Sequence, residues 1–329
     1  MENVKKPFIT ICTPVYNQEK FVEETLESVK AQTFTDFEVV IVDDGSKDNS
    51  RQVIEPYLAD PRFIYVYQEN AGVGAARNVA IARARGEWFC HLDGDDLFTP
   101  DALETFVRLA KSAPDLNFVY GNMEMFSPDG TKRTALTPDF FGSGDIRHLI
   151  YSKYGYPTAS VMVRTEKLRQ IGGYKTDLPL LEDYDMYLRY AHSGLNAASE
   201  DKVVALYRVL HGGKTSNLVR ASKFAAEIAE SVPETDPALR KCLRKAIGFH
   251  KSRYHLMSAI ECGPENKKEF LRHVVRSIYY RPRRQKRAII AAALTSIAMV
   301  SRTKKFDGLL RKLIYGAQEM PWAEESFGK

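Results

Sequence analysis

Carboxylate side chains crowd one short stretch of the chain. Asp93, Asp95 and Asp96 fall within four residues, directly after an apolar run typical of a buried strand. Carboxylates so close together repel one another unless a cation lies between them, and hard oxygen ligands of this kind suit Mg²⁺ or Mn²⁺. The other interpretation is a solvated acidic turn. An EF-hand is disfavoured, because the later ligand positions of that loop are missing.

A second group of residues points to an anionic ligand. Gly72 and Gly74 stand at the start of an expected helix, and Arg77 follows three residues after Gly74. A dinucleotide fingerprint would have its glycines after the first strand, where residues 13–17 contain none. We therefore expect the positive end of a helix and the Arg77 guanidinium to face an anion.

These residues must be positioned by an alternating series of strands and helices. The expected strands are residues 8–12, 37–42, 63–67 and 87–92, and the expected helices are residues 18–32, 49–58 and 73–85, with a fourth helix opened by Thr99 as N-cap and Pro100. This alternation predicts an α/β fold with an open, mostly parallel sheet flanked by helices. In such sheets ligands bind at the carboxyl ends of the strands. Residues 13–17, 43–46, 70–74 and 93–96 should therefore converge on one crevice.

Composition places the chain among ordinary globular proteins. Its 329 residues are 44% hydrophobic and 27% charged, which excludes collagen-like, low-complexity and disordered classes. Four cysteines without CxxC or Cys/His spacing argue against a zinc module and fit a reducing compartment. We find no secretory signal, and the longest apolar-rich stretch, residues 288–300, is too short to span a bilayer. These features predict a cytoplasmic location, which includes the inner face of the cell membrane.

Charge divides the chain into two regions. The net charge is +5, yet residues 1–238 carry 26 Lys and Arg against 35 Asp and Glu, whereas residues 239–312 carry 20 against 4. An acidic front and a basic back indicate two units with different roles. We place a domain that carries the chemistry at residues 1–222 and a basic, all-helical region at residues 223–329.

The basic region contains a cationic cluster, RPRRQKR at residues 281–287, followed by apolar residues at helical spacing. A solvated cationic face explains this pattern, and so does contact with an anionic membrane surface through residues 281–305. No recognised nucleic-acid-binding motif accompanies the cluster, so we expect no nucleic-acid partner.

Several motifs in a fixed order resemble those of family 2 glycosyltransferases. They are TICTPVYN at 10–17, EVVIVDDGS at 38–46, NAGVGAARN at 70–78 and GEWFCHLDGDD at 86–96. IGGY at 171–174, followed by Glu182, Asp183 and Arg189, is similar to the acceptor-side motif of the same family. The resemblance covers roughly residues 7–215 and implies the GT-A type of Rossmann-like, twisted sheet.

On the donor side, the resemblance implies a role for each matching residue. Nucleotide-sugar contacts are expected from Thr13, Pro14, Tyr16, Asp44, Arg77 and Asp93. Among them, Asp44 would bond the base, and Asp93 would contact the ribose or the hydration shell of the metal. Asp95 would bind the metal ion, Mn²⁺ or Mg²⁺, that bridges the diphosphate, and His211 is the second candidate for the metal site.

On the acceptor side, the resemblance implies that Asp183 is the catalytic base. Glu182 would brace the loop or contact the acceptor, and Arg208, with Tyr207 and His211, would close over the diphosphate. Gly94 departs from the family pattern, in which many relatives have a small polar residue or alanine.

The implied function is that of an inverting, metal-dependent glycosyltransferase of bacterial, hexosyltransferase type. It would move a sugar from a nucleotide donor, with UDP-sugars favoured, to an acceptor hydroxyl of a glycan or glycolipid in surface polysaccharide or glycoconjugate biosynthesis. The alternative from another class is a non-catalytic nucleotide-sugar-binding or scaffold protein of the same fold. A nucleotidyltransferase is disfavoured, because the loop after the first strand lacks the Gly, Arg and Lys that such an enzyme needs.

Overall fold

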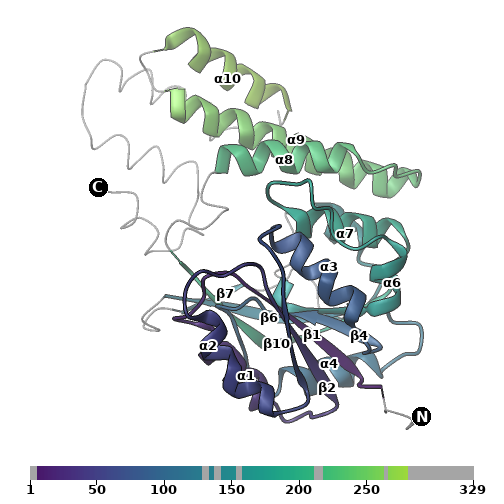
Figure 1. Cartoon of the computed structure of the whole chain (residues 1–329). Helices are drawn as coiled ribbons and strands as arrows, with labels where there is room; N and C mark the ends of the chain where they lie inside the picture. The colour runs from purple at the N-terminus through teal and green to yellow at the C-terminus, as the bar shows by residue number, and fades with distance from the viewer. Residues whose placement is uncertain are drawn as a thin grey trace. The chain divides into compact units, whose positions relative to one another are not determined.

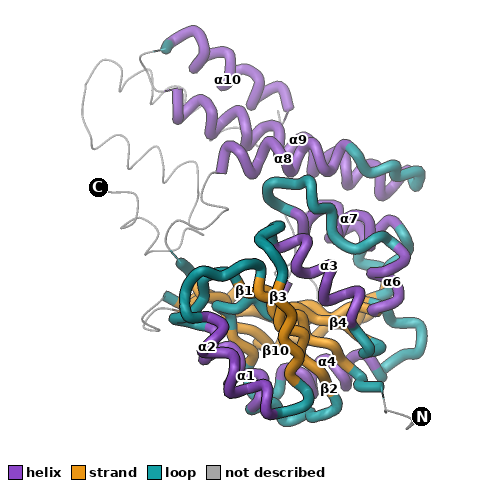
Figure 2. The backbone as a smooth tube through the Cα atoms, in the orientation of Figure 1, coloured by secondary structure: helices purple, strands orange, loops and turns teal. Residues whose placement is uncertain are grey.

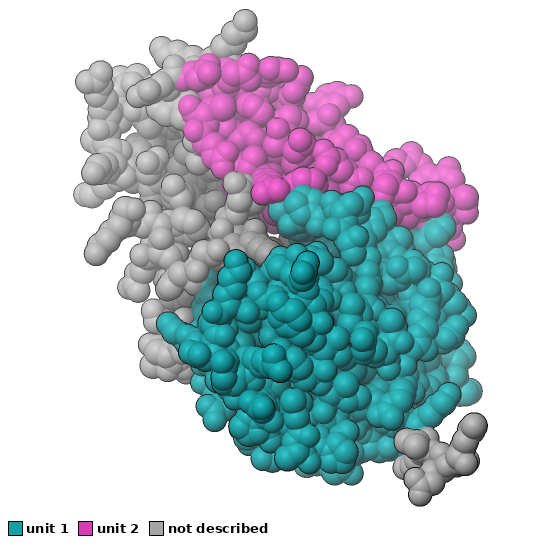
Figure 3. All heavy atoms as spheres, in the orientation of Figure 1, with its two compact units in different colours: residues 1–210 teal, residues 211–329 magenta. Residues whose placement is uncertain are grey.

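The computed structural model describes residues 6–127, 133–136, 142–152, 158–210, 218–262 and 266–280. The chain divides into two compact units, residues 1–210 and residues 211–329, whose described residues are coloured separately in Figure 3. The sequence placed the domain boundary after residue 222, a position inside helix α8 (Leu218–Glu230), and that boundary stays a prediction. Each unit is described separately below.

The described residues of unit 1 form one ten-stranded sheet. Its strands are β1 (Ile9–Val15), β2 (Phe37–Asp43), β3 (Phe63–Tyr67), β4 (Trp88–His91), β5 (Leu97–Phe98), β6 (Phe118–Phe126), β7 (Arg133–Leu136), β8 (Gly142–Gly144), β9 (Val161–Arg164) and β10 (Ala197–Arg208). The order is β3-β2-β1-β4-β9-β6-β10-β5, with β7 on β6 and β8 on β10, as Figures 1 and 2 show in part. The predicted open α/β sheet is confirmed.

The sheet is parallel where strands alternate with helices and mixed elsewhere. β3, β2, β1 and β4 run parallel, as predicted, and β6 is parallel to β10. β9 is antiparallel to both β4 and β6, and β7 is antiparallel to β6. Six residues separate β6 from β7, too few for the crossover that a parallel pair needs. The second half of the sheet therefore departs from the mostly parallel arrangement.

Helices cover the sheet of unit 1. They are α1 (Val22–Lys30), α2 (Ser50–Ile54), α3 (Val73–Arg83), α4 (Ala102–Ala110), α5 (Arg147–Ser152), α6 (Thr165–Gln170) and α7 (Glu182–His192), with 3₁₀ turns at Glu55–Ala59 and Thr158–Ser160. α3 packs on β1 and β2, and α4 packs on β6 and β10. Alternate residues of β1, β2 and β4 join side chains of α1 and α4 in the main core. Both strands are buried on both faces, which explains the nearly continuous apolar run of β2.

Two expectations about helices were wrong. The helix expected over residues 49–58 is divided at Glu55, because Pro56 has no N–H and cannot continue the α-helical ladder. Thr99 is not a helix cap, since α4 begins at Ala102. Instead, the Thr99 hydroxyl donates to the carbonyl of Val203 (3.0 Å) and ties the chain to β10.

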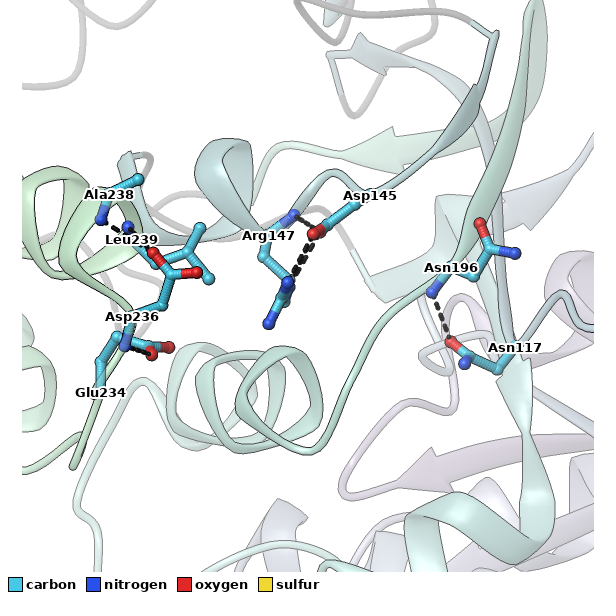
Figure 4. A network of polar contacts seen from close by, with 8 residues as sticks. All are labelled: Asn117, Asp145, Arg147, Asn196, Glu234, Asp236, Ala238 and Leu239. Atoms are coloured by element: carbon cyan, nitrogen blue, oxygen red, sulfur yellow. Dashed lines mark hydrogen bonds and ion pairs between the residues drawn. The ribbon is translucent and has the colours of Figure 1, made fainter.

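Unit 2 is helical over its described residues, as the sequence predicted. α8 (Leu218–Glu230), α9 (Pro237–Cys262) and α10 (Lys267–Tyr280) follow one another, and α9 packs against both of the others. Asp236 caps α9, since its carboxylate accepts hydrogen bonds from the backbone N–H groups of Ala238 (2.8 Å) and Leu239 (3.1 Å), as Figure 4 shows. Pro237 at the first helical position completes this start signal. The described helices include none long and apolar enough to cross a membrane.

Candidate active site

The loops after β1 and β2 are tied together. The backbone N–H of Asn17 donates to the Ser46 hydroxyl (3.0 Å), and Asn17 adopts a left-handed φ of 54°. Of the residues expected in the nucleoside pocket, Thr13 and Pro14 are buried in β1, while Tyr16 is 45% exposed. The buried Thr13 hydroxyl has no hydrogen-bond partner among the described residues. Three of the expected donor contacts therefore lie together at the carboxyl end of β1.

Asp44 holds the loop that leads into α3. Its Oδ1 accepts hydrogen bonds from Gln68 Nε2 (2.6 Å) and the backbone N–H of Ala71 (2.8 Å), and its Oδ2 accepts one from the N–H of Gly72 (2.9 Å). Gly72 has a φ of 91°, a conformation that glycine adopts without strain. Asp44 thus fixes the N-terminus of α3, and its contact with a base stays a prediction.

Residues 93–96, which follow β4 and are called the acidic run here, are held in place by Arg208 of β10. The buried Asp96 accepts a hydrogen bond from the Arg208 backbone N–H (3.0 Å), and Arg208 Nε donates to the backbone carbonyl of Asp95 (2.9 Å). Arg208 is itself 4% exposed and forms an ion pair with Glu24 (2.8 Å). Arg208 therefore fixes the backbone conformation of the acidic run through its contacts with Asp95 and Asp96.

Negative charge accumulates on this run. Burial and the neighbouring Asp93 carboxylate raise the pKa of Asp95 to about 6, and burial with both neighbours raises the pKa of Asp96 well above its usual range. Tyr207, 39% exposed on β10, lies in the same field, and burial and these carboxylates raise the pKa of its phenol.

The donor set of the run fits a hard divalent cation. Asp95 is partly exposed at the strand end, its oxygens are of the type that Mg²⁺ and Mn²⁺ take, and a cation there would relieve the repulsion that raises its pKa. Within the described part of the chain, no three His, Cys, Asp or Glu side chains form a preassembled metal cluster. Among these residues, Asp95 is the carboxylate best placed to bind a cation, and further ligands would be needed. His211, the other candidate, lies outside the described residues.

Arg77 joins the acidic run to the start of α7. It projects from α3, and its Nη2 donates to both oxygens of Asp93 (3.0 and 3.2 Å), while its Nη1 donates to Glu182 (2.9 Å). Arg77 is 3% exposed, its guanidinium lies 5.3 Å from the ring centre of Tyr174, and its Nε has no partner among the described residues. The bridge brings together residues that are more than 100 positions apart.

Asp183 directly follows Glu182 in the sequence. Arg77 forms its ion pairs with Asp93 and Glu182 and not with Asp183. Glu182 forms an ion pair with Arg77, whereas the Asp183 carboxylate accepts a hydrogen bond from the backbone N–H of Tyr184 (2.7 Å). Burial, and the negative charges of Glu182 and Asp93, raise the pKa of Asp183 to about 6, although Arg77 opposes the shift. Arg77 contacts both Asp93 and Glu182, the residue before Asp183, so the acidic run and Asp183 lie near the same guanidinium.

The backbone before α7 is strained. Leu181, immediately N-terminal to Glu182, has a φ of 65° in the left-handed region, which is unfavourable for a branched side chain. Leu181 is buried, so packing holds this conformation. Strain of this kind clusters at functional sites, and here it orients the first residues of α7.

The turn at Gly172–Tyr174 contacts both α3 and the Arg77 side chain. Asn78 donates to the carbonyl of Tyr174 (2.8 Å) and accepts from the Tyr174 N–H (2.7 Å), so the turn is paired with α3. The Tyr174 hydroxyl lies 2.7 Å from Nε2 of the buried His91, which ends β4. Burial and the charge of Arg77 lower the pKa of His91, which keeps the ring neutral.

Hydrogen bonds from Arg189 also connect the same turn to α7. The buried Asp185 accepts a hydrogen bond from Arg189 Nε (2.6 Å) and pairs with Lys175 (2.8 Å). The Arg189 guanidinium also donates to the carbonyls of Ile171 and Gly173 (both 2.7 Å).

Sequence reasoning assigned no role to His91, Asn78 or Asp185. One signal was available, because Asn78 ends the motif at residues 70–78.

Comparison with known proteins gives this site a family context. Residues 10–172 match the model of the family described as glycosyl transferase family 2. An uncharacterized glycosyltransferase of Haemophilus influenzae is 34% identical over 184 residues, which cover 55% of this chain and 61% of that protein. Chondroitin synthase of Escherichia coli is 30% identical over 216 residues, 64% of this chain and 30% of that protein. The chain thus spans between about a third and three fifths of these relatives.

Solved structures share the fold. S. aureus TarS 1-349 in complex with UDP-GlcNAc has a TM-score of 0.65 and 20% identity, with 93% of this chain and 90% of that chain covered. The mannosyltransferase PcManGT from Pyrobaculum calidifontis, in complex with GDP-Man and Mn²⁺, has a TM-score of 0.60 and 20% identity, with coverage of 95% and 85%. The fold is therefore the GT-A glycosyltransferase fold, as expected. Over residues 10–172, the chain is similar to the proteins described as glycosyl transferase family 2.

Proposed function

We propose that the protein is an inverting, metal-dependent glycosyltransferase that moves a sugar from a nucleotide-diphosphate donor to an acceptor hydroxyl. The observation that carries this proposal is the Arg77 bridge. Because it binds Asp93 and Glu182 at the same time, it holds the acidic run and Asp183 in one site. A donor sugar held over the acidic run would then lie within reach of a base at the start of α7.

On the donor side, Thr13, Pro14 and Tyr16 are proposed to line the nucleoside pocket, with Asp44 at the base. The N-terminus of α3 supplies a positive partial charge for the phosphates. Asp95 is the proposed protein ligand of Mn²⁺ or Mg²⁺, with His211 as a further one. When bound, the metal would neutralise the charge that develops on the departing nucleotide diphosphate.

On the acceptor side, Asp183 is proposed to take the proton of the attacking hydroxyl. A carboxylate can do this when it lies within hydrogen-bond reach of that proton. Its raised pKa favours the role, because a stronger base accepts the proton more readily at neutral pH. Direct displacement at the anomeric carbon inverts its configuration, and Glu182, already paired with Arg77, is proposed to position the loop.

We propose a UDP-sugar as donor and a glycan or glycolipid as acceptor, in the synthesis of surface polysaccharide or glycoconjugate. The donor is supported by the UDP-GlcNAc complex of a structurally similar protein, although another neighbour holds GDP-Man. The acceptor class is supported by the name of the chondroitin synthase relative.

The proposal is tested by titrating UDP into the protein with Mn²⁺ or with EDTA, in an isothermal titration calorimeter. We expect UDP to bind at least about tenfold more tightly with Mn²⁺, and Asp95→Asn to remove this difference. Asp60→Asn is the matched control, since Asp60 forms a surface pair with Arg62 (2.7 Å) just before β3. Equal UDP affinity with and without the metal would contradict the proposed metal role.

A further inference from the structure

Helix α10 of unit 2 has one face that is fully engaged. Phe270, Val274 and Ser277 are each at most 6% exposed, and Phe270 and Val274 form a small core with Ala259 of α9. The Ser252 hydroxyl of α9 donates to the backbone carbonyl of Ser277 (3.1 Å). These contacts fix how α10 is rotated on α9.

The rotation leaves an apolar stripe exposed on α10. Leu271 is 54% exposed, Val275 63% and Tyr279 78%. They are four residues apart, so they follow one another along a single side of the helix. Among the described residues, seven large hydrophobic side chains are strongly exposed, and three of them form this stripe.

Positive charge lies along one edge of the stripe. Arg272 and Arg276, both exposed, each follow a stripe residue directly and therefore line its edge. Arg272 also pairs with the exposed Glu269 (3.2 Å). Together α9 and α10 contain ten Lys and Arg but two Asp and Glu.

This charge decides between the possible occupants of the stripe. A second copy of the chain would bring one strongly positive helical pair against another, which is unfavourable. An apolar stripe edged by arginines, with a tyrosine at one end, has the composition of a helix that lies in a membrane interface. An anionic lipid surface satisfies both the apolar side chains and the cations.

We infer that α10 binds an anionic membrane surface. Leu271, Val275 and Tyr279 enter the boundary between headgroups and acyl chains, while Arg272 and Arg276 contact lipid phosphates. This inference is independent of the proposed transferase chemistry. It is also separate from the membrane contact through residues 281–305 that the sequence left open. Those residues lie outside the described structure.

The test is flotation of the full-length protein with vesicles of phosphatidylcholine alone, or of equal parts phosphatidylcholine and phosphatidylglycerol. We expect binding to the anionic vesicles only, and its release near 1 M salt, where the screening length is about 3 Å. The triple variant L271S/V275S/Y279S should bind these vesicles at least about tenfold more weakly, and R272Q/R276Q should lose binding to a similar degree.

The matched control is Leu58→Ser, which removes an exposed leucine (38%) from unit 1 and should leave vesicle binding unchanged. Metal-dependent UDP binding should be equal in all variants, which separates this inference from the proposed function and reports correct folding. Undiminished vesicle binding by the triple variant would overturn the inference. So would equal binding to both vesicle types, or a loss of self-association in sedimentation with no change in vesicle binding.

Discussion

At the scale of single residues, two adjacent carboxylates at the start of α7 have different environments. Glu182 is paired with Arg77, whereas the Asp183 carboxylate contacts the N–H of Tyr184. Consecutive helical residues point about 100° apart, so one of the two can face an acceptor while the other faces α3. This difference is the structural argument for Asp183, and not Glu182, as the proposed base.

Replacement of Asp183 should therefore impair chemistry more than donor binding. Asp183→Asn keeps the shape of the side chain but cannot take a proton, so kcat should fall by about 10²–10⁴-fold. The measurement is the rate of UDP release with acceptor present, together with the UDP affinity by calorimetry, which should stay near the wild-type value. Full activity in Asp183→Asn would place the base elsewhere, and Asp60→Asn again serves as the matched surface control.

The pKa of Asp183 predicts how activity depends on pH. Burial raises this pKa to about 6, so the carboxyl is protonated and inactive as a base below that pH. In the wild type, kcat/KM should rise about tenfold per pH unit up to this value and level off above it. The profile is best recorded at saturating Mn²⁺, because a bound cation keeps the Asp95 carboxyl ionised. A flat profile between pH 5 and 7 would contradict the assignment.

At the scale of elements, the site depends on how α3, β4 and α7 are joined. Arg77 forms ion pairs with Asp93, just after β4, and with Glu182 of α7, and the turn at Gly172–Tyr174 is paired with Asn78 of α3. These contacts are short, between 2.8 and 3.2 Å, and the Arg77 guanidinium that makes two of them is buried, so the geometry of the acidic run and of Asp183 should change together when one of them is lost.

Removal of the Arg77 guanidinium should damage both stability and function. Arg77→Met leaves Asp93 and Glu182 without their cation in a largely buried site, which should lower the free energy of unfolding by about 3–5 kcal/mol. Arg77→Lys keeps the charge but lacks the fork that binds two carboxylates at once, so it should recover part of the loss. Urea unfolding measures the effect, and a loss below about 1 kcal/mol for Arg77→Met would show that the bridge is dispensable.

Two adjacent glycines offer a matched test of the turn before α7. Gly172 and Gly173 have φ values of 79° and 65°, but a methyl group on Gly172 would meet open space, whereas one on Gly173 would collide with the amide oxygen of Asn78. Gly172→Ala should therefore cost about 1 kcal/mol of unfolding free energy, and Gly173→Ala about 2–4 kcal/mol. Equal losses in urea unfolding would mean that the Asn78 contact adds nothing to the turn.

At the scale of the whole molecule, the chain divides into an acidic sheet unit and a basic helical unit. The sheet, its core and the described site residues all lie within residues 1–210. A fragment of residues 1–217, which retains His211, should therefore unfold cooperatively and bind UDP with Mn²⁺ about as tightly as the full chain. Calorimetry on both proteins tests this, and a fragment that does not fold would show that unit 1 depends on residues 218–329.

Much of the fold was determined by the sequence alone. The strands of the parallel half were located to within a few residues, and β3 (Phe63–Tyr67) was predicted with its observed bounds. Apolar periodicity and strand–helix alternation are local properties, so they can be read along the chain. The same reasoning placed the carboxylates at the ends of β2 and β4, because parallel strands end at a common edge.

The tertiary structure alone decided which of these groups are already engaged. Arg77 and Glu182 are 105 residues apart, so their ion pair cannot be predicted from a local sequence pattern. Thr99 looked like a helix cap, but β10 offered its hydroxyl a carbonyl partner in the sheet. Asp44 and Arg208 likewise form hydrogen bonds with distant backbone groups. A side chain forms the contacts that the packed fold brings within its reach, and these depend on chain segments far away in the sequence.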